Sequence, residues 1–265
     1  MKIKGVHRSP YNLPLHAPLP GSPTRHCQRC GVLVGLESDA GTIGWGDIAP
    51  LEGFSDESLD EADAALSAFT PVLQKLEIAA DKSPLKDGVL RVLEHADLCS
   101  SLRFGLETAL LNLAALQRGA SWHGALTGTC CDSIAVNALA SSDHMEDDVR
   151  DSVRRGYGNI KIKVGGYSPE HAAERVRDAA HAGGEGVVLR VDANRTWALD
   201  AAIRFAGLVQ DFPIEYIEEP VEALSDIAPF VNQSAVPVAL DESLDTLDRV
   251  IEGIHALVLK PTLRG

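Results

Sequence analysis

Short apolar runs alternate with longer segments of helical spacing through the second half of the chain, from residue 159 to residue 263. Each run is rich in Val, Ile and Leu, and each has a lysine or a carboxylate at its far end. In order they read NIKIKVGG, VVLRVDAN, IEYIEEP, VPVALDES and ALVLKPT. This pattern is typical of strand–helix units in a parallel sheet. With the preceding small-residue run CCDSIAVNALAS, it predicts six units, the last of which ends after its strand.

The first half of the chain has a different pattern. Residues 30–46 predict two antiparallel strands joined by a Ser-Asp-Ala-Gly turn, and a helix follows with Ser55 and Ser58 as capping candidates. A second helical segment spans residues 89–118. The earlier stretch YNLPLHAPLP alternates Leu with Pro, which predicts a loop or an edge segment because proline cannot donate to a strand ladder. These elements indicate an α+β domain.

A change of composition separates the two patterns. Residues 117–129 are rich in Gly, Ser and His and have little periodicity, which is typical of a domain joint. We therefore expect an α+β domain over residues 1–125 and an α/β domain over residues 126–265.

The charge of the chain limits its partners. A net charge of −14 and a pI near 5.0 argue against nucleic acid and anionic membranes, which a negative field repels. No apolar run approaches the roughly 20 residues of a membrane span, and MKIKGVHRSP lacks the apolar core of a secretory signal. Five cysteines are too few for a disulfide framework. We expect a soluble cytoplasmic protein with no nucleic-acid or membrane partner; the sequence leaves its oligomeric state open.

Three carboxylates stand at the ends of consecutive predicted strands, namely Asp192, Glu218 and Asp241. One strand and one crossover helix separate each from the next, so adjacent parallel strands present them to a common point. Without a counter-ion they would repel one another. A divalent cation removes that repulsion, and an all-carboxylate set favours Mg²⁺, with Mn²⁺ also possible. A single acid in such a place more often caps a helix, but three at regular spacing favour the metal site.

Three lysines accompany these carboxylates. Lys161 and Lys163 are two residues apart, so both side chains lie on one face of their strand, and we expect that face to be the barrel interior. Buried lysines near a cation have lowered pKa values, which lets one of them act as a base. Lys260 is predicted on the sixth strand, across the interior. A base beside a metal-bound carboxylate predicts proton removal from the adjacent carbon through a metal-stabilised enediolate.

The succession KxK, VDAN, EEP, DES and a further lysine resembles the muconate-lactonising branch of the enolase superfamily, over essentially the whole chain. Within it, ALDESL followed by LVLKPTLRG, together with YNLPLHAPL and TIGWGDIAPLEGFSDESL, is similar to the o-succinylbenzoate synthase family. The resemblance implies an enolase-type α/β fold, in which an N-terminal α+β capping domain covers a (β/α) TIM-like barrel. We expect the barrel here to lack its last strands, because residues 128–265 are too few for the roughly 250 of a complete barrel.

The resemblance also implies a role for each motif residue. Lys163 would remove the proton, Lys161 would tune Lys163, and Lys260 would stabilise the enediolate. The Mg²⁺ ligands would be Asp192, Glu218 and Asp241, and the residues supporting them or the substrate would be Arg190, Asn194 and Glu242.

The implied reaction is carbon–oxygen lysis in menaquinone biosynthesis. It is the syn dehydration of 2-succinyl-6-hydroxy-2,4-cyclohexadiene-1-carboxylate, a small-molecule carboxylate, to 2-succinylbenzoate. An N-acylamino acid racemase or a dipeptide epimerase fits the same frame, with Lys163 and Lys260 as bases on opposite faces. For the missing strands, we expect a longer protein, a completing partner chain or a truncated, non-catalytic remnant.

Overall fold

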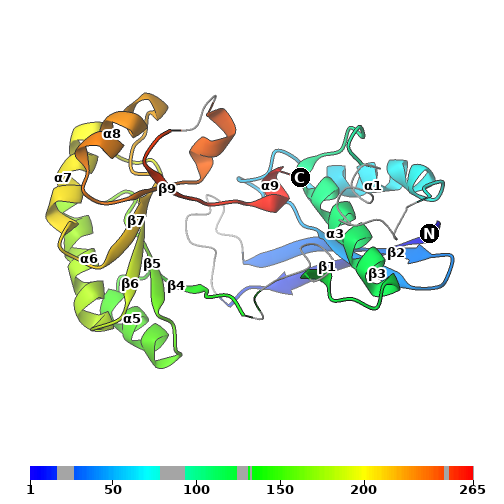
Figure 1. Cartoon of the computed structure of the whole chain (residues 1–265), viewed down its shortest axis with the longest axis horizontal. Helices are drawn as coiled ribbons and strands as arrows, with labels where there is room; N and C mark the ends of the chain where they lie inside the picture. The colour runs from blue at the N-terminus through cyan, green and yellow to red at the C-terminus, as the bar shows by residue number, and fades with distance from the viewer. Residues whose placement is uncertain (17–26, 78–92, 124–130, 132, 248–250, 265) are drawn as a thin grey trace. The chain divides into compact units, whose positions relative to one another are not determined.

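The computed structural model forms two compact units (Figure 1), one of Met1–Asp132 with Lys260–Gly265 and one of Ser133–Leu259. The residues that it describes are 1–16, 27–77, 93–123, 131, 133–247 and 251–264. The expected domain boundary between residues 125 and 126 lies outside these residues. Because each unit has its own buried apolar cluster, we describe each by itself.

A three-stranded antiparallel sheet forms the first unit's base, in the order β1-β2-β3. The strands are β1 (Ile3–Pro14), β2 (Gln28–Ser38) and β3 (Ile43–Ile48). The hairpin of β2 and β3 confirms the predicted pair of strands. The Leu/Pro stretch begins on β1, which is an edge strand, as the proline content predicted; its residues 17–20 lie outside the described residues.

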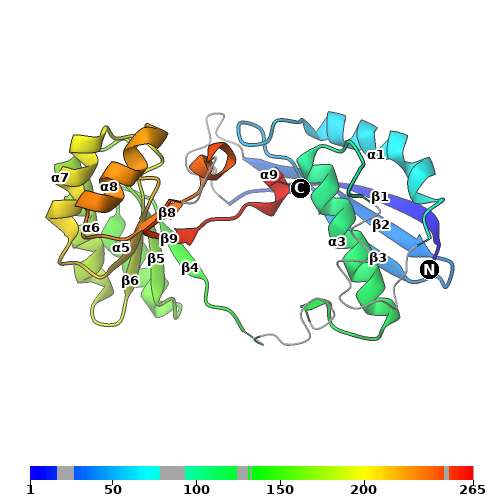
Figure 2. The same ribbon diagram turned by 45° about the horizontal axis from the view of Figure 1, so that its top comes forward.

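Two helices cover one face of this sheet, α1 (Leu59–Leu73) and α3 (Ser100–Gln117) (Figure 2). Helix α3 begins later than the predicted start at residue 89, because its N-cap is Cys99. Residues 89–92 of that prediction lie outside the described residues. The apolar stripe of α3 is fully buried and consists of Leu102, Leu106, Leu110 and Leu113. The short helix α9 (Pro261–Arg264) also contacts α3.

Helix α1 begins with a reciprocal cap. The Ser58 hydroxyl accepts a hydrogen bond from the Glu61 amide at 3.2 Å, and the Glu61 carboxylate accepts one from the Ser58 amide at 2.8 Å. Replacing Ser58 with alanine removes one of these bonds, so we expect the free energy of unfolding to fall by about 1 kcal/mol. Urea denaturation measures the change. Ser9→Ala, at an exposed position of β1, is the control, and an equal effect in both variants would contradict the prediction.

The second unit is a six-stranded parallel sheet in the order β4-β5-β6-β7-β8-β9, which confirms the six predicted strands. The longer helices lie along one face of the sheet (Figure 1). The strands are β4 (Asn137–Ala140), β5 (Asn159–Lys163), β6 (Val188–Asp192), β7 (Ile214–Glu218), β8 (Val238–Leu240) and β9 (Ile254–Leu257). The helical segments are α5 (Met145–Arg154), α6 (Pro169–Gly183), α7 (Leu199–Val209), η2 (Leu224–Asp226), α8 (Ile227–Gln233) and η3 (Glu242–Thr246).

The apolar side chains of alternate strand residues form the core of this unit with the helices. On β5, Ile160 and Ile162 are fully buried against this core. Ser168 caps α6 and Pro169 is in its first turn, as predicted. The other face of β5 is therefore the face that carries the two lysines.

Two further expectations concern the whole chain. No helix in the described part of the molecule is long and apolar enough to span a membrane. Among the cysteines at positions that the structure describes, Cys30, Cys99 and Cys131 carry free thiols.

Candidate active site

Charged side chains line up across β5, β6 and β7 on the sheet face opposite the helices. Lys163 pairs in register with Asp192, and Asp192 pairs with Glu218. One row earlier, Lys161 pairs with Arg190. The residues of these rows alternate with the apolar ones, so the period of two along each strand brings the predicted groups to one face.

The Lys161 ammonium lies between two buried carboxylates. Its Nζ is 2.9 Å from Asp192 Oδ2 and donates to both oxygens of Glu218, at 2.8 and 2.7 Å. Asp192 is 2 % exposed and Glu218 1 %. The structure thus brings together two of the three predicted metal ligands, with a cationic side chain bridging them.

The pKa values of Glu218 and Lys161 both lie above the usual values of these groups. Burial, the Asp192 carboxylate and the Asp241 carboxylate raise the pKa of Glu218 to about 7, although Lys161 opposes them. Burial lowers the pKa of Lys161, but Asp192 and Glu218 together outweigh burial and raise it. Carboxylates surround the Lys161 ammonium group here, which is why the direction is upward. The expectation of a lowered value concerned a lysine beside a bound cation, and it stays a prediction.

Lys163 has looser contacts than Lys161. Its Nζ donates to Asn194 Oδ1 at 3.3 Å and is 3.8 Å from Asp192 Oδ2. The backbone N–H of Asn194 in turn donates to Asp192 Oδ1 at 3.0 Å. The side-chain nitrogen of Asn194, Nδ2, is 3.5 Å from Glu242 Oε1. Asn194 therefore connects Lys163 to the carboxylates, and Glu242 lies at the edge of the same network.

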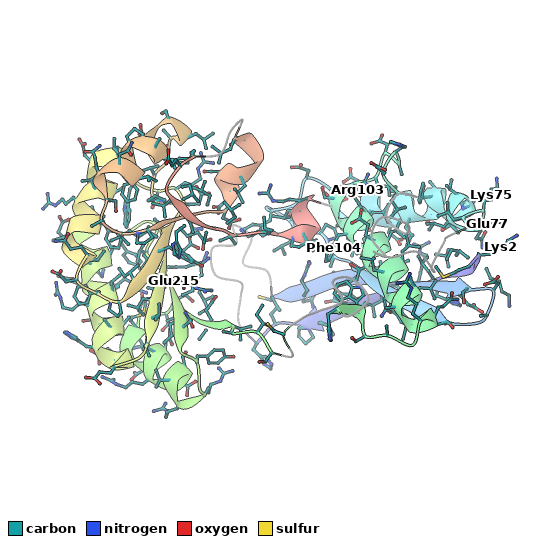
Figure 3. The ribbon with its side chains drawn as sticks, viewed as in Figure 1. Lys2, Lys75, Glu77, Arg103, Phe104 and Glu215 are labelled. Carbon is teal, nitrogen blue, oxygen red and sulfur yellow. The ribbon has the colours of Figure 1, made fainter. Side chains whose placement is uncertain are left out.

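The resemblance implied that Arg190 supports the metal ligands or the substrate, and that role stays a prediction. Arg190 Nε donates to Glu215 Oε2 at 2.6 Å, its Nη1 donates to Asn137 Oδ1 at 3.1 Å, and its guanidinium lies over the Tyr216 ring. Figure 3 labels Glu215 on β7. Arg190 thus packs one row below the carboxylates, because the Cα atoms of Arg190 and Tyr216 are register partners.

The remaining predicted residues lie at the ends of the last two strands. Asp241 directly follows β8 and is 4 % exposed. Lys260 does not lie within a strand as predicted, because β9 ends at Leu257. It immediately precedes α9 and groups with the first unit. Its role opposite Lys163 stays a prediction.

The donor set suits a hard divalent cation, since Asp192, Glu218 and Asp241 are all buried carboxylates. Within the described residues, however, no group of three His, Cys, Asp or Glu side chains is arranged to hold a metal ion. The Lys161 ammonium lies between Asp192 and Glu218 instead. The residues thus fit Mg²⁺ by their chemistry and burial, and the ligand assignment stays a prediction.

Sequence reasoning missed one residue of this network. Glu219 is fully buried, and its carboxylate binds the turn that contains Asp241. The only signal in the sequence was the doublet of acids in IEYIEEP, in which an apolar strand ends in two carboxylates instead of one.

The first unit contains a cavity of about 410 Å³. Residues of the two segments 28–30 and 50–61 line it, among them Arg29, Leu51 and Ser55. The second segment overlaps TIGWGDIAPLEGFSDESL, one of the stretches that resemble the o-succinylbenzoate synthase family.

Two family models match the chain. The model of the MenC N-terminal domain matches residues 3–113, and that of the enolase C-terminal domain-like family matches residues 144–259. The o-succinylbenzoate synthase of Enterobacter sp. (strain 638) is 31% identical over 99% of this chain and 75% of its own length. The chain belongs to the o-succinylbenzoate synthase family of the enolase superfamily. Membership of this family places it among enzymes of the lyase class.

Other proteins are similar as well. Protein PHYLLO, chloroplastic, of Arabidopsis thaliana is 31% identical over 89% of this chain, which spans 15% of that protein. The structure of the dipeptide epimerase from Cytophaga hutchinsonii, complexed with Mg and the dipeptide D-Ala-L-Val, has a TM-score of 0.82 and 25% identity. It covers 100% of this chain, which covers 73% of that structure. The enolase-type fold expected for an o-succinylbenzoate synthase is therefore confirmed.

Proposed function

We propose that this chain is an o-succinylbenzoate synthase in activity as well as in family. Its reaction would be the Mg²⁺-dependent syn dehydration of 2-succinyl-6-hydroxy-2,4-cyclohexadiene-1-carboxylate to 2-succinylbenzoate. The observation that carries the proposal is the arrangement of Lys161 and Lys163 beside Asp192 and Glu218 on one sheet face. The o-succinylbenzoate synthase of Enterobacter supplies the substrate class.

The carboxylates Asp192, Glu218 and Asp241 would hold the cation. When bound, Mg²⁺ supplies positive charge that stabilises the substrate carboxylate as the adjacent carbon loses its proton. The three acids are buried, since each is at most 4 % exposed. Mn²⁺ would be the alternative ion.

Lys163 is the group that exchanges the proton. In its neutral form, its Nζ takes the proton from the carbon next to the substrate carboxylate, and the electron pair of that C–H bond moves onto the carboxylate to give an enediolate, from which it returns to form the new double bond of the ring. The ring then expels the hydroxyl by breaking the C–O bond, and the Lys163 ammonium returns the proton, so that water leaves. Because one amine performs both transfers, the two groups leave from the same face of the ring.

Lys161 has a different task from Lys163. Two carboxylates hold its ammonium at 2.7 to 2.9 Å, so this lysine keeps its charge. Asn194, which accepts a hydrogen bond from Lys163 at 3.3 Å, orients the base. Lys260 would stabilise the developing negative charge from its position after β9.

Dipeptide epimerisation is the second candidate. The observation in its favour is the similarity over the whole chain to the dipeptide epimerase of Cytophaga hutchinsonii. The same Lys163 would then remove a proton from one face of the α-carbon, and Lys260 would return one to the other face. The two candidates differ in their substrate and in whether a C–O bond breaks.

A pair of assays on the purified protein with Mg²⁺ separates the two candidates. We expect the cyclohexadiene carboxylate to be converted to 2-succinylbenzoate, and we expect no deuterium incorporation into D-Ala-L-Val in D₂O. A sample treated with EDTA is the control and should lose the dehydration. Deuterium incorporation into the dipeptide without dehydration would contradict the proposed reaction.

The proposal also assigns the protein a cellular role. As an o-succinylbenzoate synthase it would act in menaquinone biosynthesis on a small-molecule carboxylate in the cytoplasm. Neither nucleic acid nor membrane is needed for this reaction.

A further inference from the structure

Glu219 is a fully buried carboxylate next to Glu218 in the sequence, yet it is not among the predicted ligands. Its backbone φ is +47°, in the left-handed region that side chains other than glycine rarely adopt. Such strain persists only where surrounding contacts hold the residue in place. The contacts of its carboxylate therefore indicate what the conformation is for.

Both carboxylate oxygens of Glu219 bind the turn that follows β8. Oε1 accepts hydrogen bonds from the backbone N–H groups of Asp241, at 2.7 Å, and Ser243, at 2.8 Å. Oε2 accepts one from the Ser243 hydroxyl at 2.5 Å. Charge-assisted bonds of this kind at a buried site are strong and directional. The side chain of Glu219 thus holds the turn in place at two residues, Asp241 itself and Ser243.

The backbone of Glu219 extends the same connection to the neighbouring strands. Its N–H donates to the Ala239 carbonyl of β8 at 3.0 Å, and its carbonyl accepts from the Arg195 N–H, beyond β6, at 2.9 Å. One residue therefore joins the ends of β6, β7 and β8, the strands that carry the three carboxylates. The direction in which Asp241 leaves its strand depends on this connection.

We propose that Glu219 is the positioning residue for Asp241 and aims that carboxylate at the cation shared with Glu218. It acts through its hydrogen-bond acceptors and not as a ligand or as a negative charge near the ion. This inference rests on the proposed Mg²⁺ site. It explains why the strand ends in two acids: Glu218 faces the cation and Glu219 holds the next strand's ligand.

Two conservative variants separate position from charge. Glu219→Gln loses the charge, but its amide oxygen still accepts both N–H bonds and its amide nitrogen faces the Ser243 hydroxyl. Glu219→Asp keeps the charge, but its side chain is one methylene shorter. Its carboxylate oxygens therefore lie farther from the N–H groups of Asp241 and Ser243. Titration calorimetry with MgCl₂ measures the affinity of each, and circular dichroism checks the fold. We expect Glu219→Asp to weaken Mg²⁺ binding by about 10- to 100-fold, as outer contacts of metal ligands do, and Glu219→Gln by less than about threefold.

The reverse order, with the Gln variant weaker than the Asp variant, would overturn the positioning role in favour of charge. Equal affinity in all three proteins would overturn it too. Asp241→Asn is the control for the metal site. If Asp241→Asn loses Mg²⁺ binding while Glu219→Asp binds Mg²⁺ as the unaltered protein does, only the positioning role is refuted. If the unaltered protein binds no Mg²⁺, the metal site and this inference both fail. Should Glu219→Asp not fold, Ser243→Ala removes one of the three bonds, and an unchanged Mg²⁺ affinity there would overturn the inference.

Discussion

Replacing Lys163 with alanine lowers turnover of the cyclohexadiene carboxylate by about 10³-fold or more, because the variant loses the only group proposed to move the proton. Mg²⁺ binding and folding should survive. The Lys163 Nζ is 3.8 Å from Asp192 and 3.3 Å from Asn194, so its removal breaks no close ion pair of the carboxylates. This contrasts with Lys161, whose ammonium is within 2.9 Å of both Asp192 and Glu218.

The measurement pairs steady-state turnover with MgCl₂ titration calorimetry on the same sample. Lys75→Ala is the matched control, since Lys75 is exposed just beyond the end of α1 (Figure 3) and takes no part in the site. A Lys163→Ala variant that dehydrates the substrate at the unaltered rate would rule out the proposed base. A variant that is inactive but has also lost Mg²⁺ would assign Lys163 to cation binding instead.

Replacing Gly46 with alanine has the largest expected effect on stability. This glycine of β3 packs directly against α3, and a Cβ atom on it would lie 1.9 Å from the Gly105 carbonyl oxygen and 2.9 Å from the Ala109 nitrogen. Both atoms belong to a helix backbone, which cannot rotate aside as a side chain does. We expect the free energy of unfolding to fall by about 3 kcal/mol or more, enough to unfold the first unit of a marginally stable protein.

Thermal unfolding followed by calorimetry tests this expectation. Gly207→Ala is the matched control, because Gly207 lies inside α7 and a Cβ atom there meets nothing within 4 Å. Alanine in a helix interior should stabilise that helix by up to about 1 kcal/mol. A Gly46→Ala protein as stable as the unaltered one would show that β3 and α3 pack less closely than described.

The elements that the sequence predicted correctly are those that depend on local rules. Short segments rich in Val, Ile and Leu, each followed by a segment of helical spacing, are typical of parallel strands, which is why β5 to β8 were found at their positions. The N-terminal cap of α6 was also predicted correctly, since Ser168 and Pro169 act within one turn of the helix. The start of β1 was missed because most of its residues are exposed and carry no apolar alternation.

The prediction for the C-terminal end of the chain failed at Lys260 for a similar reason. Lys260 was predicted inside a strand because it follows an apolar run and precedes a proline. Pairing of β9 with β8 ends earlier, at Leu257, and residue 261 begins a helix that packs on α3. Strand ends depend on the neighbouring strand, which a single run of residues does not contain.

The sequence by itself determined which residues share a face. The period of two along β5 and the even succession of strand–helix units were enough to predict that Lys161, Lys163, Asp192 and Glu218 lie on one side of the sheet. Only the tertiary structure decided what each charge does there. It put the Lys161 ammonium between two carboxylates, left Lys163 on Asn194, turned Arg190 toward Glu215, and aimed Glu219 at the turn after β8. These contacts depend on the register between strands and on partners more than 20 residues away in the chain. The periodicity of a single segment gives no information about either.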